Sequence, residues 1–418
     1  TAFVTFDGHT QGDMNSYVYV TKDLGKTWQR LGEKDLKGYC HVVRQDLKNP
    51  NLLFVGTEFG LYLSIDGGQH FIHLDHNNKV PKVAVRDIVV HQRDNALILA
   101  THGRGIIIFD DITPLRELTP EVLSQNIHIF TPKPFIIPTS GTDYGAFTND
   151  EYNASNPPTE PTVVYYQKTR HLLGDFTIEL LDENKKVLRT IAAGKRKGLN
   201  KITVPLNYAP PRVATAPTMG WGASQGPDLP FGTYTLRFNK NDEVIETPIT
   251  IMDNPKAPYT NEDRLLQQQT QRQLFEQIER LAYIATATID LKTKLANQIA
   301  TLPEQDQSKA KALVADLTQL HETLIYNQEG LIIDDEARLR EKLNSLYASV
   351  LWAQGRPTQS QLSRTTTLTQ AVGNAEKTLQ QLVEQKLPVV NQLLEAKGLS
   401  ILSLLSYEVW DKATHKEP

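Results

Sequence analysis

A turn sequence that occurs twice limits the fold of this chain more than any other feature. It reads TKDLGKTW from Thr21 and SIDGGQHF from Ser64, so the two copies start 43 residues apart. In the first copy Asp23 can accept hydrogen bonds within the turn, Gly25 can adopt a positive φ, and Trp28 is typical of a new strand. A spacing of this size is typical of four-stranded propeller blades, so the sequence predicts blades.

The repeat extends beyond the turn, because residues 42–64 align with residues 87–109 at an offset of about 45. The expected strands are Cys40–Arg44, Asn51–Gly56, Leu61–Ser64 and one starting at His70, then Arg86–His91, Ala96–Ala100 and Ile106–Phe109. Before them, TAFVTF and SYVYVT predict the second and third strands of a blade whose first strand is missing. A propeller closes with roughly four to eight blades, so we expect a C-terminal part whose partners include upstream blades of the same protein or of a separate fragment.

The two turns resemble the Asp-box of the BNR repeat, S/T-x-D-x-G-x-T-W, which sialidase propellers, sortilin-type receptors and photosystem assembly factors share. The matching positions are Thr21, Asp23, Gly25, Thr27, Trp28, Ser64, Asp66, Gly68 and Phe71, with departures at His70 and Phe71. The runs FVGTEFGLYLS, ATHGRGI and FDDITPL resemble large secreted bacterial proteins of the BNR glycosyl hydrolase or sortilin-like type, over residues 1–118. This resemblance implies a secreted or periplasmic protein whose Asp-boxes are structural turns away from any active site.

Loops on the face opposite these turns are the expected binding site. Successive loops of antiparallel strands alternate between two faces, and loops on a rigid scaffold commonly carry function. The candidate ligand-binding residues on this face are Asp7, His9, Asp13, Glu58, His102 and Arg104. Alternative roles are an ion pair of Glu58 and Arg104 with each other or with neighbouring blades, and a hydrogen bond of His102 that closes its turn.

Hydrolase chemistry makes demands that the sequence does not visibly meet. Retaining glycosidases need two carboxyl groups roughly 5 to 5.5 Å apart, or a Tyr nucleophile with an acidic partner in sialidases. Asp7, Asp13 and Glu58 could form a pair, but no catalytic constellation is visible. A calcium site at Asp23, Asp66 or the pair at 110–111 lacks the ligand spacing of an EF-hand, so we expect no metal and no cofactor.

The remaining chain predicts three further parts. Residues 119–160 are rich in Pro, Thr and Asn and read as a linker strap, whose segment IHIFTPKPFIIP we expect to pack along the propeller edge. Residues 161–254 alternate like the strands of an immunoglobulin-like or fibronectin-like sandwich. Residues 258–397 have the apolar periodicity of an antiparallel helical bundle with a break at Pro388, and the tail 398–418 is expected to dock through Trp410.

Composition excludes some partners. The net charge is -4 with both signs mixed along the chain, which gives no electrostatic footprint for nucleic acid. No run of about eighteen apolar residues predicts a membrane span. Cys40 is the single cysteine, and we expect it to be a buried small hydrophobe.

Together these patterns predict a multidomain β and α protein: terminal propeller blades, a sandwich and a helical bundle. The expected function is non-catalytic binding of a protein, a peptide or a glycan at the loop face. A sialidase-like glycoside hydrolase is one alternative, and an assembly or scaffold factor acting through the sandwich and the bundle is another.

Overall fold

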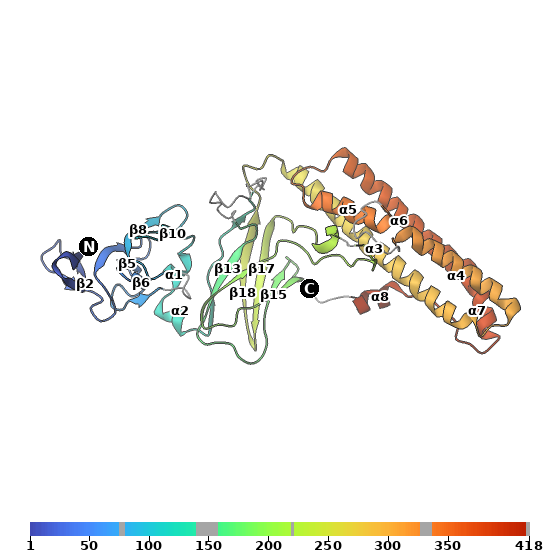
Figure 1. Ribbon diagram of the computed structural model, residues 1–418, viewed down its shortest axis with the longest axis horizontal. Coiled ribbons are helices and arrows are strands. Elements are labelled where there is room, and N and C mark those ends of the chain that lie inside the picture. The colour runs from blue at the N-terminus through green and yellow to red at the C-terminus, as the bar shows by residue number, and fades with distance from the viewer. Residues whose placement is uncertain (75–79, 139–157, 219–220, 327–336, 415–418) are drawn as a thin grey trace. The chain divides into compact units, whose positions relative to one another are not determined.

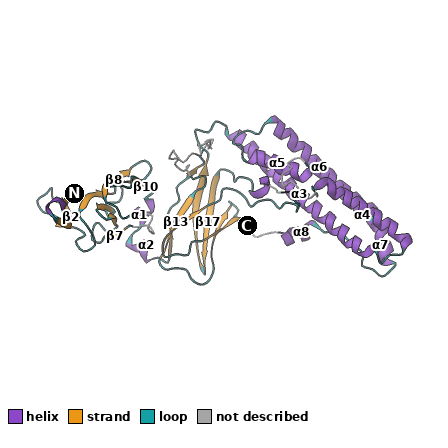
Figure 2. Cartoon of the chain, in the orientation of Figure 1, coloured by secondary structure: helices purple, strands orange, loops and turns teal. Residues whose placement is uncertain are grey.

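The computed structural model describes residues 1–74, 80–138, 158–218, 221–326 and 337–414. It is a mixed β and α structure, with several small sheets and a C-terminal helical region (Figures 1 and 2). The chain divides into two compact units. The first contains residues 1–131, 163–172 and 194–201, and the second contains residues 132–162, 173–193 and 202–418.

Three small antiparallel sheets follow one another in the first unit. The first contains β1 (Ala2–Gly8), β2 (Asp13–Thr21) and β3 (Gln29–Arg30), with the short 3-10 helix η1 (His9–Gln11) between β1 and β2. The second contains β4 (Cys40–Gln45), β5 (Leu53–Thr57), β6 (Gly60–Ser64) and β7 (Ile72–His73). The third contains β8 (Val85–His91), β9 (Ala96–Thr101) and β10 (Ile106–Phe109). The strand predictions for these residues are confirmed, and β10 has the predicted bounds.

Two apolar layers separate these sheets. Successive side chains of a strand point to opposite faces, so β5 supplies both layers. Leu53 and Val55 pack with Val18 and Val20 of the first sheet, whereas Phe54 packs on the side of the third sheet. The middle sheet is therefore covered on both faces, which explains why β5 and β6 are buried along their whole length.

The two repeated turns have the same hydrogen-bond pattern. The Asp23 carboxylate accepts from the Thr27 backbone N–H at 2.9 Å and from the Thr27 hydroxyl at 2.6 Å, and Gly25 has φ +89°. In the second copy Asp66 accepts from the backbone N–H of His70 at 3.1 Å. The His70 ring takes the place of the threonine hydroxyl, with Nδ1 2.7 Å from the Asp66 carboxylate. The predicted roles of Asp23 and Gly25 are confirmed, and the departure at His70 preserves the turn.

Cys40 lies at the start of β4 and has no exposed surface. Burial raises the pKa of its thiol to about 11, so the group stays protonated and unreactive at neutral pH. The prediction of a buried small hydrophobe is confirmed.

The segment after the third sheet supplies strands to two further sheets. It contains α1 (Thr113–Glu117), α2 (Pro120–Ser124), β11 (Ile127–Ile129) and β12 (Phe135–Ile136). In the first unit β11 pairs with β13 (Thr162–Gln167), which lies between β11 and β16 (Gly198–Thr203). In the second unit β12 pairs with β18 (Glu243–Met252). The expectation that this apolar segment packs along a propeller edge is wrong, because its backbone groups find partners in other sheets. Residues 139–157 of the predicted strap lie outside the described residues.

A five-stranded sheet opens the second unit. Its order is β12, β18, β17 (Gly232–Lys240), β14 (Phe176–Leu181) and β15 (Val187–Ala192). The polar turns DENKK and NKNDE connect the hairpins β14–β15 and β17–β18. Lys185 and Asn241 adopt positive φ in these turns, at 62° and 51°.

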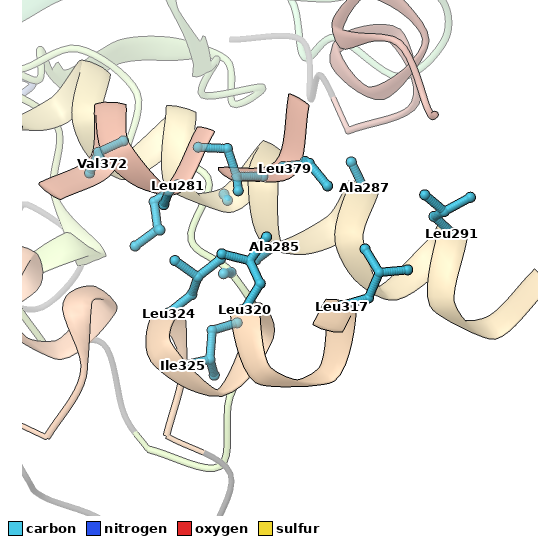
Figure 3. Close-up of a cluster of buried hydrophobic side chains, with 14 of the residues drawn as sticks. Leu281, Ala285, Ala287, Leu291, Leu317, Leu320, Leu324, Ile325, Val372 and Leu379 are labelled. Carbon is cyan, nitrogen blue, oxygen red and sulfur yellow. The ribbon is translucent and has the colours of Figure 1, made fainter. Parts of the chain in front are cut away.

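Helices form the rest of the second unit. They are α3 (Asn261–Ile299), α4 (Glu304–Leu324), α5 (Leu339–Leu351), α6 (Gln359–Gln385), α7 (Leu387–Glu395) and α8 (Tyr407–Thr414). The apolar stripe of α3 from Leu274 to Leu295 faces one apolar core that α4, α5, α6 and α7 share, part of which is seen in Figure 3. The break between α6 and α7 falls just before Pro388, as predicted. Among the described residues, no helix combines the length and the apolar character that crossing a membrane requires.

The loop between β16 and β17 docks on these helices. It includes the 3-10 helix η2 (Trp221–Ser224). Asp228 forms an ion pair with Arg264 of α3 at 2.9 Å, and the Arg340 side chain of α5 donates to the Ala214 carbonyl at 2.7 Å. These polar contacts place the loop on α3 and α5 within the second unit.

The C-terminal tail is fixed by one aromatic residue. Trp410 of α8 is 3% exposed, and the Arg212 guanidinium lies 4.2 Å from the centroid of its ring. Arg212 also pairs with Glu279 of α3 at 2.8 Å and with Asp411 at 2.6 Å. The prediction that the tail docks through Trp410 is confirmed.

Candidate binding site at one end of the three sheets

One end of the three sheets of the first unit carries the loops β1–β2, β5–β6 and β9–β10. We call it the loop end and define it by residues 8–12, 57–60 and 101–105. The repeated turns at residues 21–28 and 64–71 follow the far ends of β2 and β6, because each strand runs away from the loop end.

The first strands of the second and third sheets also begin at the loop end. The Glu58 backbone N–H donates to the Tyr39 carbonyl at 3.1 Å, and the His102 backbone N–H donates to the Ala84 carbonyl at 2.9 Å. The residues that lead into β4 and β8 therefore lie beside the loops that were predicted to bind.

A β-bulge occurs at the same position of β4 and β8. Cys40 pairs with Thr57 and Val42 pairs with Gly56, which leaves His41 as the extra residue. In β8 the corresponding extra residue is Arg86, 45 positions later. Bulges redirect a side chain and are frequent beside functional sites, so both residues leave the regular alternation of their strands.

The two bulge residues meet a carboxylate from the first sheet. The Asp7 carboxylate lies 3.2 Å from Nδ1 of His41 and 2.5 Å from Nδ1 of His9. Nη1 of Arg86 lies 3.5 Å from Nδ1 of His41. The Tyr39 ring stacks on His9 with ring centroids 4.5 Å apart and meets His41 edge-on at 5.0 Å. We call Asp7, His9, Tyr39, His41 and Arg86 the loop-end cluster; all three sheets contribute to it.

Charge in this cluster is divided between Asp7 and Arg86. Desolvation opposes ionisation of Asp7, but hydrogen bonds from the His9 ring and backbone outweigh it, and the pKa of Asp7 is lowered. Burial lowers the pKa of His41, and the positive charge of Arg86 lowers it further. At neutral pH the cluster therefore contains an ionised carboxylate, an uncharged His41 and a guanidinium.

His41 carries an unsatisfied polar atom. Its side chain is only 6% exposed, and Nε2 is buried without a hydrogen-bond partner among the described residues. Both Asp7 and Arg86 approach the other ring nitrogen, so either tautomer leaves Nε2 unpaired. Buried polar groups are normally paired, and an exception of this kind is typical of a functional site.

Asp13 is the first residue of β2, directly after the β1–β2 loop, and lies outside the cluster. Its carboxylate accepts from the Tyr17 hydroxyl at 2.8 Å and from the Asn15 side chain at 2.7 Å. Hydrogen bonding to Asp13 raises the pKa of Tyr17, which keeps the phenol protonated. A tyrosine and an acid thus lie together, but the tyrosine hydroxyl keeps its proton, whereas a tyrosine nucleophile has to lose it.

The structure does not bring the remaining predicted residues into contact with one another. Glu58 is half-buried, and His102 and Arg104 are exposed in the β9–β10 loop. Within the described part of the chain Glu58 and Arg104 form no ion pair, so their predicted mutual pairing is absent there. The turn beside His102 is closed instead by the Thr101 hydroxyl, which donates to the Gly105 carbonyl at 2.6 Å.

Sequence reasoning missed three members of the cluster: Tyr39, His41 and Arg86. They lie at or next to the starts of β4 and β8. The alternation of side chains expected for a strand does not reveal the bulges there. The 45-residue offset does place His41 and Arg86 at equivalent positions, and this was the available signal. No group of three or more His, Cys, Asp or Glu side chains in the described ranges could hold a metal ion.

No family model matches the chain, and no curated protein matches it. Among solved structures, an ancestral GH74 enzyme is 26% identical over 22% of the chain, with a TM-score of 0.19. The extracellular domain of a protein described as a one component system from B. thetaiotaomicron is 12% identical over 58% of the chain, with a TM-score of 0.18. The BSP domain of a biofilm associated protein is 12% identical over 52%, with a TM-score of 0.16. The chain covers 11%, 28% and 25% of these three structures, and similarities this weak assign it no activity.

Proposed function

We propose that this chain is a non-catalytic binding protein that recognises a protein, a peptide or a glycan at the loop end. One observation carries the proposal: Asp7, His41 and Arg86 converge from three successive sheets at the end that also holds the β5–β6 and β9–β10 loops. The cluster uses two equivalent bulges and leaves a buried His41 nitrogen unpaired. Both features are more typical of a binding site than of a structural core.

The cluster offers complementary groups to a polar ligand. Arg86 is exposed and forms no ion pair with any described residue, so its guanidinium is available to an acidic group. The Asp7 side chain is 26% exposed and accepts hydrogen bonds from hydroxyl or amide donors. Arg104 lies in the neighbouring loop and supplies a second cation.

The finer fold assignment also belongs to this proposal. The three sheets, their repeated turns and their two apolar layers support blades of a BNR β-propeller with Asp-box turns. The hairpins β14–β15 and β17–β18 of the five-stranded sheet support an immunoglobulin-like sandwich. A secreted or periplasmic location accompanies the propeller assignment.

Binding can be tested with a defined probe panel. The full chain is screened at pH 7 against an array of immobilised peptides and oligosaccharides, and the strongest probe is measured by calorimetry with variants. Arg86→Ala and Arg104→Ala should each weaken that probe by about 1 to 3 kcal/mol, the range for a charge-assisted hydrogen bond, without unfolding the chain.

Arg93→Ala is the matched control. Arg93 lies in the turn at the opposite end of the third sheet, is exposed, and pairs with the adjacent Asp94. Its loss should leave affinity unchanged. A probe whose affinity is insensitive to both Arg86→Ala and Arg104→Ala overturns the assignment of the loop end.

The glycoside hydrolase alternative is tested separately. The wild-type chain is assayed with chromogenic glycosides, and Glu58→Gln is compared with it. A hydrolase that uses Glu58 for proton transfer should lose a factor of roughly 100 to 10,000 in rate while retaining binding. Glycosidase activity that depends on Glu58 would replace the binding proposal with an enzymatic one.

A further inference from the structure

An aromatic groove lies on the outer face of the first sheet, away from the second. Val4, Phe6, Tyr17, Tyr19 and Trp28 line a volume of about 580 Å³. Phe6 is 56% exposed and Trp28 is 46% exposed. The opposite face of the same sheet is covered, because Val18 and Val20 pack against the second sheet.

The repeat shows what the equivalent surface looks like when it is covered. Counted from the two turns, Tyr19 corresponds to Tyr62 and Trp28 corresponds to Phe71. Tyr62 and Phe71 are each 5% exposed. The same two positions are therefore buried in the second sheet, whereas in the first sheet Tyr19 is half-buried and Trp28 is exposed.

The cover over Phe71 is the segment that connects the first sheet to the second. Leu31 and Leu36 belong to the same apolar cluster as Phe71 and are 5% and 3% exposed. The carboxylate of Asp35 accepts the Phe71 backbone N–H at 2.9 Å. This segment thus supplies two leucines and one acceptor to the turn of the following sheet.

The connecting segment continues into β4. This strand forms the edge of the second sheet next to β5. By strand pairing, Ala2 opposite Thr21 corresponds to Leu53 opposite Ser64, so β1 is equivalent to β5. Among the described residues the first sheet has the order β1-β2-β3, with no strand in the position of β4.

We propose that this groove is the docking surface for a preceding sheet of the same repeat. Its connecting segment places two leucines on Tyr19 and Trp28, its acidic side chain accepts the Trp28 backbone N–H, and its last strand pairs with the free edge of β1. The templates are the contacts of Leu31, Leu36 and Asp35 with the second sheet and the pairing of β4 with β5.

A second copy of this chain matches the groove less well. The outer face of the third sheet is apolar, with Val89, Ile106 and Ile108 exposed by 47%, 70% and 56%. However, the third sheet has three described strands and lacks the fourth strand that leads into a connecting segment. It cannot supply the counterparts of Leu31, Asp35 and Leu36.

The test adds a copy of the connecting segment and β4 to the front of the full chain. A copy of residues 29–52 is joined in front of Ala2, so that Leu52 of the copy precedes β1 as Leu52 precedes β5. The copy contains no tryptophan, so the extension adds no tryptophan signal to that of the native residues. Hydroxyl-radical footprinting then compares Trp28 with the exposed Trp352 and the buried Trp410, which are 61% and 3% exposed.

We expect the reactivity of Trp28 to fall from near that of Trp352 to near that of Trp410. The same extension carrying Leu36→Asp in the copy should not protect Trp28. Unchanged reactivity overturns the proposal, and so does protection that survives Leu36→Asp. Digestion of the extension by trypsin also counts against it, because the covered interface holds such a segment in place.

Other occupants give different results in the unextended chain. Protection of Trp28 that grows with protein concentration would identify a second copy and overturn the proposal. Protection by an oligosaccharide from the binding panel would do the same in favour of a ligand groove.

Discussion

The carboxylate of Asp46 and the guanidinium of Arg116 form a buried ion pair between residues 70 positions apart. Two hydrogen bonds of 2.9 and 2.8 Å join them, and their side chains are 0% and 8% exposed. Burial opposes ionisation of Asp46, but hydrogen bonds from Arg116 and from the Asn49 and Lys48 backbone outweigh it and lower the pKa of Asp46. The pair connects α1 to the turn between β4 and β5.

Removal of one partner should therefore be costly. Asp46→Ala is expected to lower the free energy of unfolding by about 3 to 5 kcal/mol, because it leaves the Arg116 charge buried and unpaired. Urea unfolding of the full chain measures this change. The exposed pair of Arg93 and Asp94 is the control, and Asp94→Ala should leave the midpoint unchanged. An Asp46→Ala midpoint equal to that of the control would contradict the prediction.

The turn carboxylate of Asp23 should give the first unit a measurable acid sensitivity. Hydrogen bonds from the Thr27 side chain and backbone lower its pKa to about 2, below the value near 3.9 of an unfolded aspartate. A depressed folded pKa contributes stability above the unfolded pKa, and that contribution is lost as the pH falls from about 4 to about 2. Asp23→Asn should lower the melting temperature at pH 7 and reduce its slope over this acid range.

Ligand affinity at the loop end is the control for that variant. The turn at residues 21–28 lies at the far end of β2, so Asp23→Asn should leave affinity unchanged. Lost affinity with an unchanged melting temperature would contradict the separation of the turns from the site.

Arg86 should control the titration of His41. The Arg86 charge lowers the pKa of His41, so Arg86→Ala is expected to raise the midpoint of the His41 ring signals in an NMR titration. Arg86→Lys retains the charge and should leave the midpoint nearer to that of the wild type. Asp7→Asn removes an opposite charge and should shift the midpoint downward. A midpoint that is the same in all three variants would show that the loop-end cluster does not form in solution.

Phe71 and Trp28 should respond differently to truncation. Phe71→Ala leaves a cavity under Leu31 and Leu36 and is expected to cost about 3 to 5 kcal/mol. Trp28→Ala removes a side chain that is 46% exposed, so its cost should be much smaller. Parallel urea titrations compare the two. Equal costs would mean that Trp28 is covered in the unextended chain.

Local pattern predicted most elements of the fold. Apolar alternation located the strands of the first unit, and an apolar stripe with helical spacing located α3. The pairing of β11 and β12 could not be predicted in this way. Both strands are short, and their partners lie far along the chain. Local periodicity in the sequence therefore does not indicate which strands they pair with.

The site was predicted only in part. Asp7 and His9 were found because they flank a loop, whereas His41 and Arg86 were missed because a bulge leaves no mark on the alternation of a strand. Glu58 and Arg104 lie at the predicted end, but a shared end does not impose contact between side chains of different sheets.

The equivalent bulges at His41 and Arg86 separate recognition from folding. Each bulge adds one residue that the ladder of its strand does not use, so the side chain there departs from the alternation that its neighbours follow. A histidine and an arginine already occupy the same structural position. Libraries randomised at the exposed residue 86, with His41 retained, should therefore yield folded chains with altered ligand preference, and each further copy of the repeat would add one more bulge position.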